Sequence, residues 1–123
     1  MMIVDSCGWL EWFTDGPLAD QYHQYLIDRS QLIVPAIVIY EAYKFLRREI
    51  DEEKALLAVA YMKDAIIAPL DDTLALVAAD KSLAEGLAMA DAIILATGHY
   101  YDCPIITSDA DLKGKPGVQF LSK

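Results

Sequence analysis

The chain has 123 residues, of which 55% are hydrophobic, and this length and composition predict one domain over residues 1–123 with a sizeable core. Its longest uncharged apolar stretches fall well short of the roughly 18 residues that a membrane span needs, and no basic segment precedes a long apolar one. We therefore expect a cytoplasmic protein without a membrane partner. The formal net charge of −9 excludes nucleic-acid binding that relies on a broadly basic surface.

The two cysteines of the chain, Cys7 and Cys103, are isolated and lack the CxxC spacing of a metal or redox pair. Isolated cysteines in a chain of this kind are typical of reduced core residues. We therefore expect both to be reduced and to lie in or near the core, without a role in metal binding.

Short apolar runs alternate along the chain with segments of helical periodicity. The apolar runs predict strands at residues 2–4, 31–34, 66–70, 103–107 and 118–121. The periodic segments predict helices at residues 8–13, 18–28, 35–49, 51–64, 71–86 and 87–95. Ser6 is expected to cap the first helix, Pro35 to open the third, and Asp71 to cap the fifth. This alternation predicts an α/β fold, a three-layer α/β/α sandwich with a mostly parallel central sheet.

Acidic residues follow two of the predicted strands at the point where each strand ends. Asp5 comes directly after the first strand, and Asp109 and Asp111 follow the fourth. Right-handed crossovers would bring these two strand ends to one edge of the sheet, where open α/β sheets bind ligands. Taken alone, Asp5 is better interpreted as a cap or turn residue than as part of a site.

Two further acids interrupt the apolar stripes of predicted helices. Glu41 shares a helical face with Val38 and Phe45, and Asp91 shares one with Ile94. A charge on such a stripe is costly unless something compensates it. One alternative is a salt bridge from either acid to one of four nearby basic residues, namely Arg29, Lys44, Lys63 and Lys81.

The other alternative is that the four acids meet at one site. Converging carboxylates repel one another strongly, and a hard divalent cation with oxygen ligands, Mg²⁺ or Mn²⁺, resolves that repulsion. Such a site is typical of phosphodiester hydrolysis, in which the cation polarises a phosphate and activates a water. Ser6 and Thr107 are interpreted as caps or as hydrogen-bond donors that support the metal-binding carboxylates.

Four segments of the chain together resemble the PIN domain, in particular the small single-domain VapC toxins of prokaryotic toxin–antitoxin pairs. The resemblance covers nearly the whole chain, with the segments in the same order. They are Ile3-Val4-Asp5-Ser6, Val34-Pro35-Ala36 followed by Glu41, Ala90-Asp91-Ala92-Ile93-Ile94-Leu95-Ala96, and Ile106-Thr107-Ser108-Asp109.

This resemblance implies an Mg²⁺- or Mn²⁺-dependent endoribonuclease that is usually a homodimer and is held inactive by a small antitoxin. The acidic positions of the family carry over to Asp5, Glu41, Asp91 and Asp109, while Asp111 remains an alternative for the fourth acid. Asp5, Asp91 and Asp109 are expected to hold the metal, and Glu41 to act as a ligand or to orient the attacking water.

A local basic cluster and a group of aromatic residues are assigned to partners. The basic cluster is expected to contact RNA or an acidic antitoxin and consists of Lys44, Arg47 and Arg48. The aromatic residues of the first helix exceed what one short helix usually buries, which indicates either core or an oligomer interface, and they are Trp9, Trp12 and Phe13.

Two other functions remain open from the sequence. Length and αβ alternation also fit a phospho-receiver domain, with Asp71-Asp72 after the third strand as candidate phosphorylation site, although a receiver needs a pair of acids after its first strand. The acids could instead hold a structural cation in a non-catalytic binding domain.

Overall fold

Five short strands form the centre of the computed structural model, which describes residues 1–123. They are β1 (Ile3–Val4), β2 (Ile33–Pro35), β3 (Ile66–Ala68), β4 (Ile105–Thr107) and β5 (Val118–Phe120). β1 pairs with β4, β4 with β5, and β2 with β3, in each case in parallel. A parallel bridge between Met2 and Leu32 joins the two sets, so the strand order is β3-β2-β1-β4-β5. The predicted α/β fold with a mostly parallel sheet is confirmed.

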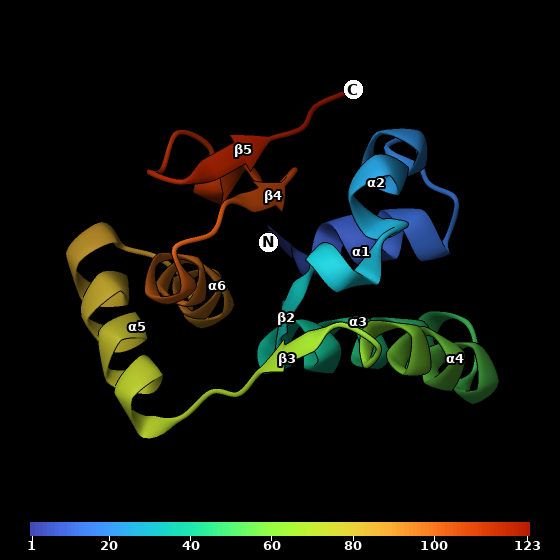
Figure 1. Ribbon diagram of the computed structural model, residues 1–123, viewed down its shortest axis with the longest axis horizontal. Helices are drawn as coiled ribbons and strands as arrows, with labels where there is room; N and C mark the ends of the chain where they lie inside the picture. Colours follow the sequence, from blue (N-terminus) through green and yellow to red (C-terminus); the bar gives the residue numbers. More distant parts are fainter.

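Six helices surround the strands. They are α1 (Ser6–Phe13), α2 (Ala19–Leu26), α3 (Ala36–Glu49), α4 (Glu52–Met62), α5 (Asp72–Glu85) and α6 (Met89–Tyr101), with 3-10 turns at Arg29–Gln31 and Ala110–Leu112. Figure 1 shows α5 and α6 on the left and α1, α2 and α4 on the right, with the strands between them, which is the layered arrangement that the sequence predicts. No helix combines the length and the hydrophobicity that a membrane span requires.

Prolines and local caps shorten several strands relative to the sequence prediction. The second strand begins at Ile33 rather than at residue 31 because the preceding residues form a 3-10 turn, which Asp28 caps through its side chain. β3 ends at Ala68 because the next residue, Pro69, has no N–H for the ladder. Pro35 is the last residue of β2 and the N-cap of α3, so it precedes that helix instead of opening it.

The first helix begins two residues earlier than predicted, and its cap is Asp5 rather than Ser6. The Ser6 N–H donates to Asp5 Oδ1 at 2.7 Å, and the Asp5 backbone is extended, as expected of an N-cap. The prediction that Ser6 caps this helix is therefore wrong. As a result, the Ser6 hydroxyl is not needed for capping, and it lies inside the first turn of α1.

The strand order places the ends of β1 and β4 side by side at the centre of the sheet. The chain leaves β1 towards β2 on one side and leaves β4 towards β5 on the other, so the two strands flank a topological switch point. Ile3, Val4, Ile105 and Ile106 are almost completely buried there. Burial of each such side chain contributes about 1.5–3 kcal/mol, which fixes the two strand ends against each other.

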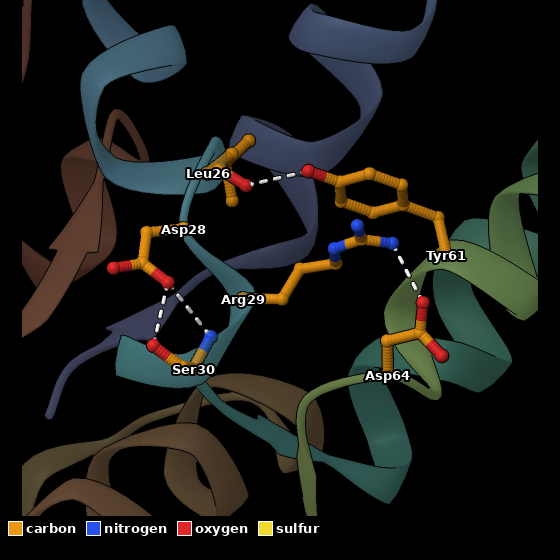
Figure 2. A network of polar contacts seen from close by, with 6 residues as sticks. All are labelled: Leu26, Asp28, Arg29, Ser30, Tyr61 and Asp64. Atoms are coloured by element: carbon orange, nitrogen blue, oxygen red, sulfur yellow. Dashed lines mark hydrogen bonds and ion pairs between the residues drawn. The ribbon is translucent and has the colours of Figure 1, made fainter.

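A polar network links the segment after α2 to the end of α4 (Figure 2). Arg29 pairs with Asp64 at 2.7 Å and lies over the ring of Tyr61, 4.0 Å from its centroid. The Tyr61 hydroxyl donates to the Leu26 carbonyl at 2.9 Å. Because Arg29 forms its ion pair with Asp64, it does not form a salt bridge with Glu41 or Asp91.

Tyr22 packs against α1 at a glycine. A Cβ atom at Gly8 would collide with Tyr22 Cε1 and would lie 2.6 Å from Val4 Cγ1. Glycine inside a helix costs about 1 kcal/mol relative to alanine, so its presence in α1 is explained by the close approach of the Tyr22 ring.

We expect Gly8→Ala to lower the free energy of unfolding by about 1–3 kcal/mol despite the better helix propensity of alanine, because the new methyl group overpacks a buried contact. Urea denaturation would measure the change. In a Tyr22→Leu background the same substitution should cost clearly less, and an equal cost in both backgrounds would contradict the role of the ring.

Candidate metal centre

Three carboxylates from distant parts of the chain meet at the ends of β1 and β4. Asp5 ends β1, Asp109 follows β4, and Asp91 lies in the first turn of α6. One oxygen from each of the three lies within 4.8 Å of the others. Asp5 is only 3% exposed, and the other two are half-buried. The side chains therefore form a compact acidic cluster at the switch point of the sheet.

Hydrogen bonds fix the orientation of the buried Asp5 carboxylate. The Thr107 hydroxyl donates to Asp5 Oδ2 at 2.7 Å, and the Ser6 N–H donates to Oδ1 at 2.7 Å. Thr107 Oγ1 also accepts from the Asp109 N–H at 3.0 Å, so this one hydroxyl links two members of the cluster. Burial raises the pKa of Asp5, and the bonds from Thr107 and Ser6 partly oppose that rise.

Asp91 carries the clearest electrostatic signature of the cluster. Burial, the contact with Asp109 and the negative charges of its acidic neighbours raise the pKa of Asp91 from 3.8 to about 7. In the protein alone, this carboxyl therefore still binds a proton at pH values where an ordinary aspartate is fully ionised.

Glu41 lies at the margin of the cluster, outside the group of three. Its Oε1 accepts a hydrogen bond from the Ser6 hydroxyl at 3.0 Å, which joins α3 to the start of α1. Burial raises the pKa of Glu41, and the charges of Asp5 and Asp109 raise it further. Glu41 thus belongs electrostatically to the same site.

Protein cations do not neutralise these four acids, so the salt-bridge alternative from the sequence is wrong. The ion pairs of the chain are Arg29–Asp64, Arg47–Glu52, Arg48–Glu49 and Lys115–Glu85. Uncompensated carboxylates that converge to this degree fit a hard divalent cation, and a donor set without histidine or cysteine favours Mg²⁺ or Mn²⁺ over zinc.

Asp109 rather than Asp111 supplies the carboxylate that follows β4. Asp111 is exposed and is not part of the group of three. Its N–H donates to Asp109 Oδ1 at 2.9 Å, so Asp109 also caps the 3-10 turn that follows. Asp111 acts on the site only at longer range, through its negative charge.

A hydrogen-bonded chain behind the cluster was not anticipated from the sequence. The buried Tyr22 hydroxyl donates to Ser108 Oγ at 2.9 Å, and Ser108 Oγ lies 3.4 Å from Cys7 Sγ. Cys7 Sγ is in turn 3.5 Å from Thr107 Oγ1, which holds Asp5. Tyr22 lies on an apolar helix stripe, and no sequence signal separates it from an ordinary core residue.

The basic cluster divides in the structure. Lys44 and Arg48 line a hollow of about 270 Å³ that also contains Ser6 and Glu41. Arg47 is absent from the hollow and pairs with Glu52 at 3.5 Å. The cysteines are free, as predicted, with Cys7 half-buried and Cys103 buried.

The aromatic residues of α1 lie mainly in the core. Trp9 is completely buried and stacks with Phe13 at a centroid distance of 5.7 Å. Trp12 and Phe13 are half-buried and both contact the ring of Tyr61. These contacts explain why so many aromatic residues lie on one short helix.

The phospho-receiver alternative does not fit this structure. Asp71 caps α5 by accepting from the Leu74 N–H at 2.8 Å, and it follows β3 at the edge of the sheet rather than at the acidic cluster. The strand order β3-β2-β1-β4-β5 also differs from the 2-1-3-4-5 order of receiver-type folds.

Solved structures with the same fold include several toxin–antitoxin proteins. A toxin–antitoxin complex from Klebsiella pneumoniae superimposes with a TM-score of 0.80 at 22% identity, covering 97% of this chain and 96% of that chain. VapC20 from Mycobacterium tuberculosis, described as a toxin that cleaves the sarcin–ricin loop, has a TM-score of 0.73 at 13% identity, with 83% and 84% covered. DNA-bound VapBC from Salmonella typhimurium has a TM-score of 0.74 at 12% identity, with 98% of each chain covered.

At these identities the structural likeness establishes the fold. No curated protein matches the sequence. The family model described as "PIN domain" matches residues 2–117, which include all three members of the acidic cluster and Glu41. With a matching family model over almost its entire length and the corresponding fold, this chain belongs to the PIN domain family.

Proposed function

We propose that this protein is a metal-dependent endoribonuclease that hydrolyses RNA phosphodiester bonds, and that it is the toxin of a VapBC-type toxin–antitoxin pair. The observation that carries the proposal is the convergence of Asp5, Asp91 and Asp109 without any cationic partner from the protein. The family membership and the solved toxins of the same fold support the choice of RNA as substrate.

The four acids have distinct roles in this proposal. Asp5, Asp91 and Asp109 would hold Mg²⁺ or Mn²⁺, and the bonds from Thr107 and the Ser6 N–H keep Asp5 in one orientation. A bound divalent cation supplies charge neutralisation and Lewis acidity at the scissile phosphate. Glu41, at the margin of the cluster, would orient the attacking water and accept its proton or serve as a further ligand.

The partners and location follow from the same proposal. The Klebsiella and Salmonella structures are described as toxin–antitoxin assemblies, which supports an antitoxin as protein partner. A homodimer is supported by the apolar surface between α5 and α6, where large side chains are exposed, among them Leu70, Leu83 and Met89. Cleavage of cellular RNA requires a cytoplasmic location.

The proposal is tested first by Asp5→Asn. Loss of a metal-binding charge should reduce Mn²⁺-dependent cleavage of RNA at least about 100-fold, while circular dichroism and a cooperative thermal transition remain. Unchanged cleavage would refute the proposal. Metal-dependent stabilisation of the wild-type chain without cleavage of any RNA would instead favour the non-catalytic metal-binding domain. Asp111→Asn is the matched control and should retain most activity.

Asp91 makes the stability of the metal-free protein depend on pH. Its folded-state pKa, about 7, is raised above the ordinary 3.8, so its contribution to stability is complete at low pH and is lost as the pH rises through this interval. In EDTA we expect the melting temperature to decrease as the pH is raised from about 4 to about 7.

The corresponding variant, Asp91→Asn, should flatten this decline and melt a few degrees higher than the wild type at pH 8 in EDTA. With Mn²⁺ the order should reverse, because only the wild type gains stability from the ion. Differential scanning calorimetry with and without Mn²⁺ measures both effects. A variant that melts lower than the wild type in EDTA at pH 8 would contradict the proposed repulsion.

Tyr22 is expected to position the loop that carries the cluster. Tyr22→Phe retains the ring and removes the hydroxyl that holds Ser108, so Mn²⁺ binding measured by calorimetry should weaken about three- to tenfold, less than the 10- to 100-fold typical of direct partners of a ligand. Tyr25 lies on the same helix as Tyr22, and its hydroxyl accepts from Gln119 of β5 rather than contacting the loop that carries the cluster. Tyr25→Phe is therefore the matched control. A lower metal-free melting temperature with unchanged Mn²⁺ affinity would mean that Tyr22 is only structural.

A further inference from the structure

One face of α3 carries alternating aromatic and basic side chains next to the acidic site. Tyr40, Lys44 and Arg48 are spaced four residues apart, and Phe45 lies beside them, so they share a helical face. We call these four residues the α3 strip. All four line the hollow of about 270 Å³ that also contains Ser6 and Glu41, so the strip is continuous with the acidic site.

The aromatic rings of the strip lie close to its cations. Lys44 Nζ is 5.5 Å from the centroid of the Tyr40 ring, and the Arg48 guanidinium carbon is 5.8 Å from that of Phe45. Both distances fall within the range of cation–π contact. Tyr40 is 58% exposed, so much of its side chain is open to a ligand in the hollow.

The cations of the strip are poorly neutralised although the chain carries a net charge of −9. Lys44 makes no ion pair, and Arg48 pairs only with its exposed neighbour Glu49 at 2.8 Å. A second hollow near the site, lined by Glu85 and Asp111, contains one cation, Lys115, which is already paired with Glu85 at 3.0 Å. The positive charge next to the acids is therefore concentrated on the α3 side.

Helix stability explains only part of this pattern. Arg47 and Arg48 lie in the last turn of α3, where cations interact favourably with the helix dipole. The helix dipole accounts for a cation at both positions, and Arg47 pairs with Glu52 outside the hollow. It does not explain the exposed Tyr40 ring or an unpaired Lys44 one turn earlier.

We propose that the α3 strip binds unpaired nucleotides of the RNA strand on one side of the scissile phosphate, with a base stacked on Tyr40 and phosphates contacted by Lys44 and Arg48. The inference rests on the proposed function in taking RNA as the substrate. A phosphate chain that passes four carboxylates is repelled by them, so the nearest available cations must hold it. Stacking of bases on exposed aromatic rings is the general mode of single-strand recognition.

A single strand fits the strip better than an RNA duplex or an acidic peptide. In a duplex the bases are already stacked on one another, so an exposed tyrosine adds little. An acidic peptide would use the two cations but would not require the aromatic surface. The strip therefore predicts a preference for unpaired RNA at the cleavage site.

The test measures binding separately from cleavage. Fluorescence anisotropy would follow a short, labelled single-stranded RNA of mixed sequence with protein carrying Asp91→Asn, which blocks hydrolysis. In this background Tyr40→Ala should weaken binding about five- to tenfold, the lower part of the range for base–aromatic stacking, and Tyr40→Phe should retain it. A duplex of the same sequence should bind more weakly and should not respond to Tyr40→Ala.

The cations are tested by the salt dependence of the same titration. Lys44→Gln and Arg48→Gln should each reduce the slope of log affinity against log salt by about 0.7, which corresponds to one phosphate contact on a single strand. Arg47→Gln is the matched control, because it removes a neighbouring cation of the same helix that does not line the hollow, and it should leave the slope unchanged.

Three outcomes separate this inference from the proposed function. If Tyr40→Ala and the two glutamine variants leave RNA binding unchanged while Asp5→Asn abolishes cleavage, the strip inference is overturned and the nuclease stands. If those variants instead weaken only the binding of a glutamate-rich peptide, the strip binds protein and the inference is also overturned. If the strip variants weaken RNA binding but the wild type cleaves no RNA, the inference holds and the proposed function fails.

Discussion

Mutual repulsion among carboxylates is the constraint around which this structure is organised. Asp5, Asp91 and Asp109 come within 4.8 Å of one another with no cation from the chain between them. The hydrophobic strands supply the compensating free energy, because β1 and β4 are buried side by side and their carboxyl ends must coincide. The fold thus uses core packing to maintain a site that is electrostatically unfavourable in the protein alone and that a divalent cation would neutralise.

Hydrogen bonds then fix the orientation of the carboxylates that the strands bring together. Thr107 connects the Asp5 carboxylate to the backbone of Asp109, and Tyr22 reaches the same loop through Ser108. Gly8 permits the Tyr22 ring to approach closely enough to do so. Packing between α1 and α2 is therefore coupled to the geometry of the acids, although neither helix supplies a carboxylate to the cluster.

The net charge of −9 and the proposed polyanionic substrate can be reconciled through the local distribution of charge. A bound cation would neutralise the acidic cluster, and the cations of the α3 strip lie within a hollow that reaches Glu41. An acidic surface elsewhere would weaken nonspecific binding of nucleic acid. Selectivity for unpaired RNA would then depend on a few contacts beside the site.

The sequence by itself determined the α/β class, the order of the elements and which acids were unusual, because periodicity and the position of a charge on an apolar stripe are local properties. It also indicated that Asp5 and Asp109 follow strands. Only the tertiary structure decided that Asp109 and not Asp111 enters the cluster, that Lys44 and Arg48 but not Arg47 line the hollow, and that Tyr22 reaches the site. These outcomes depend on side-chain directions and on contacts between residues distant in the chain, for which a single sequence carries no signal.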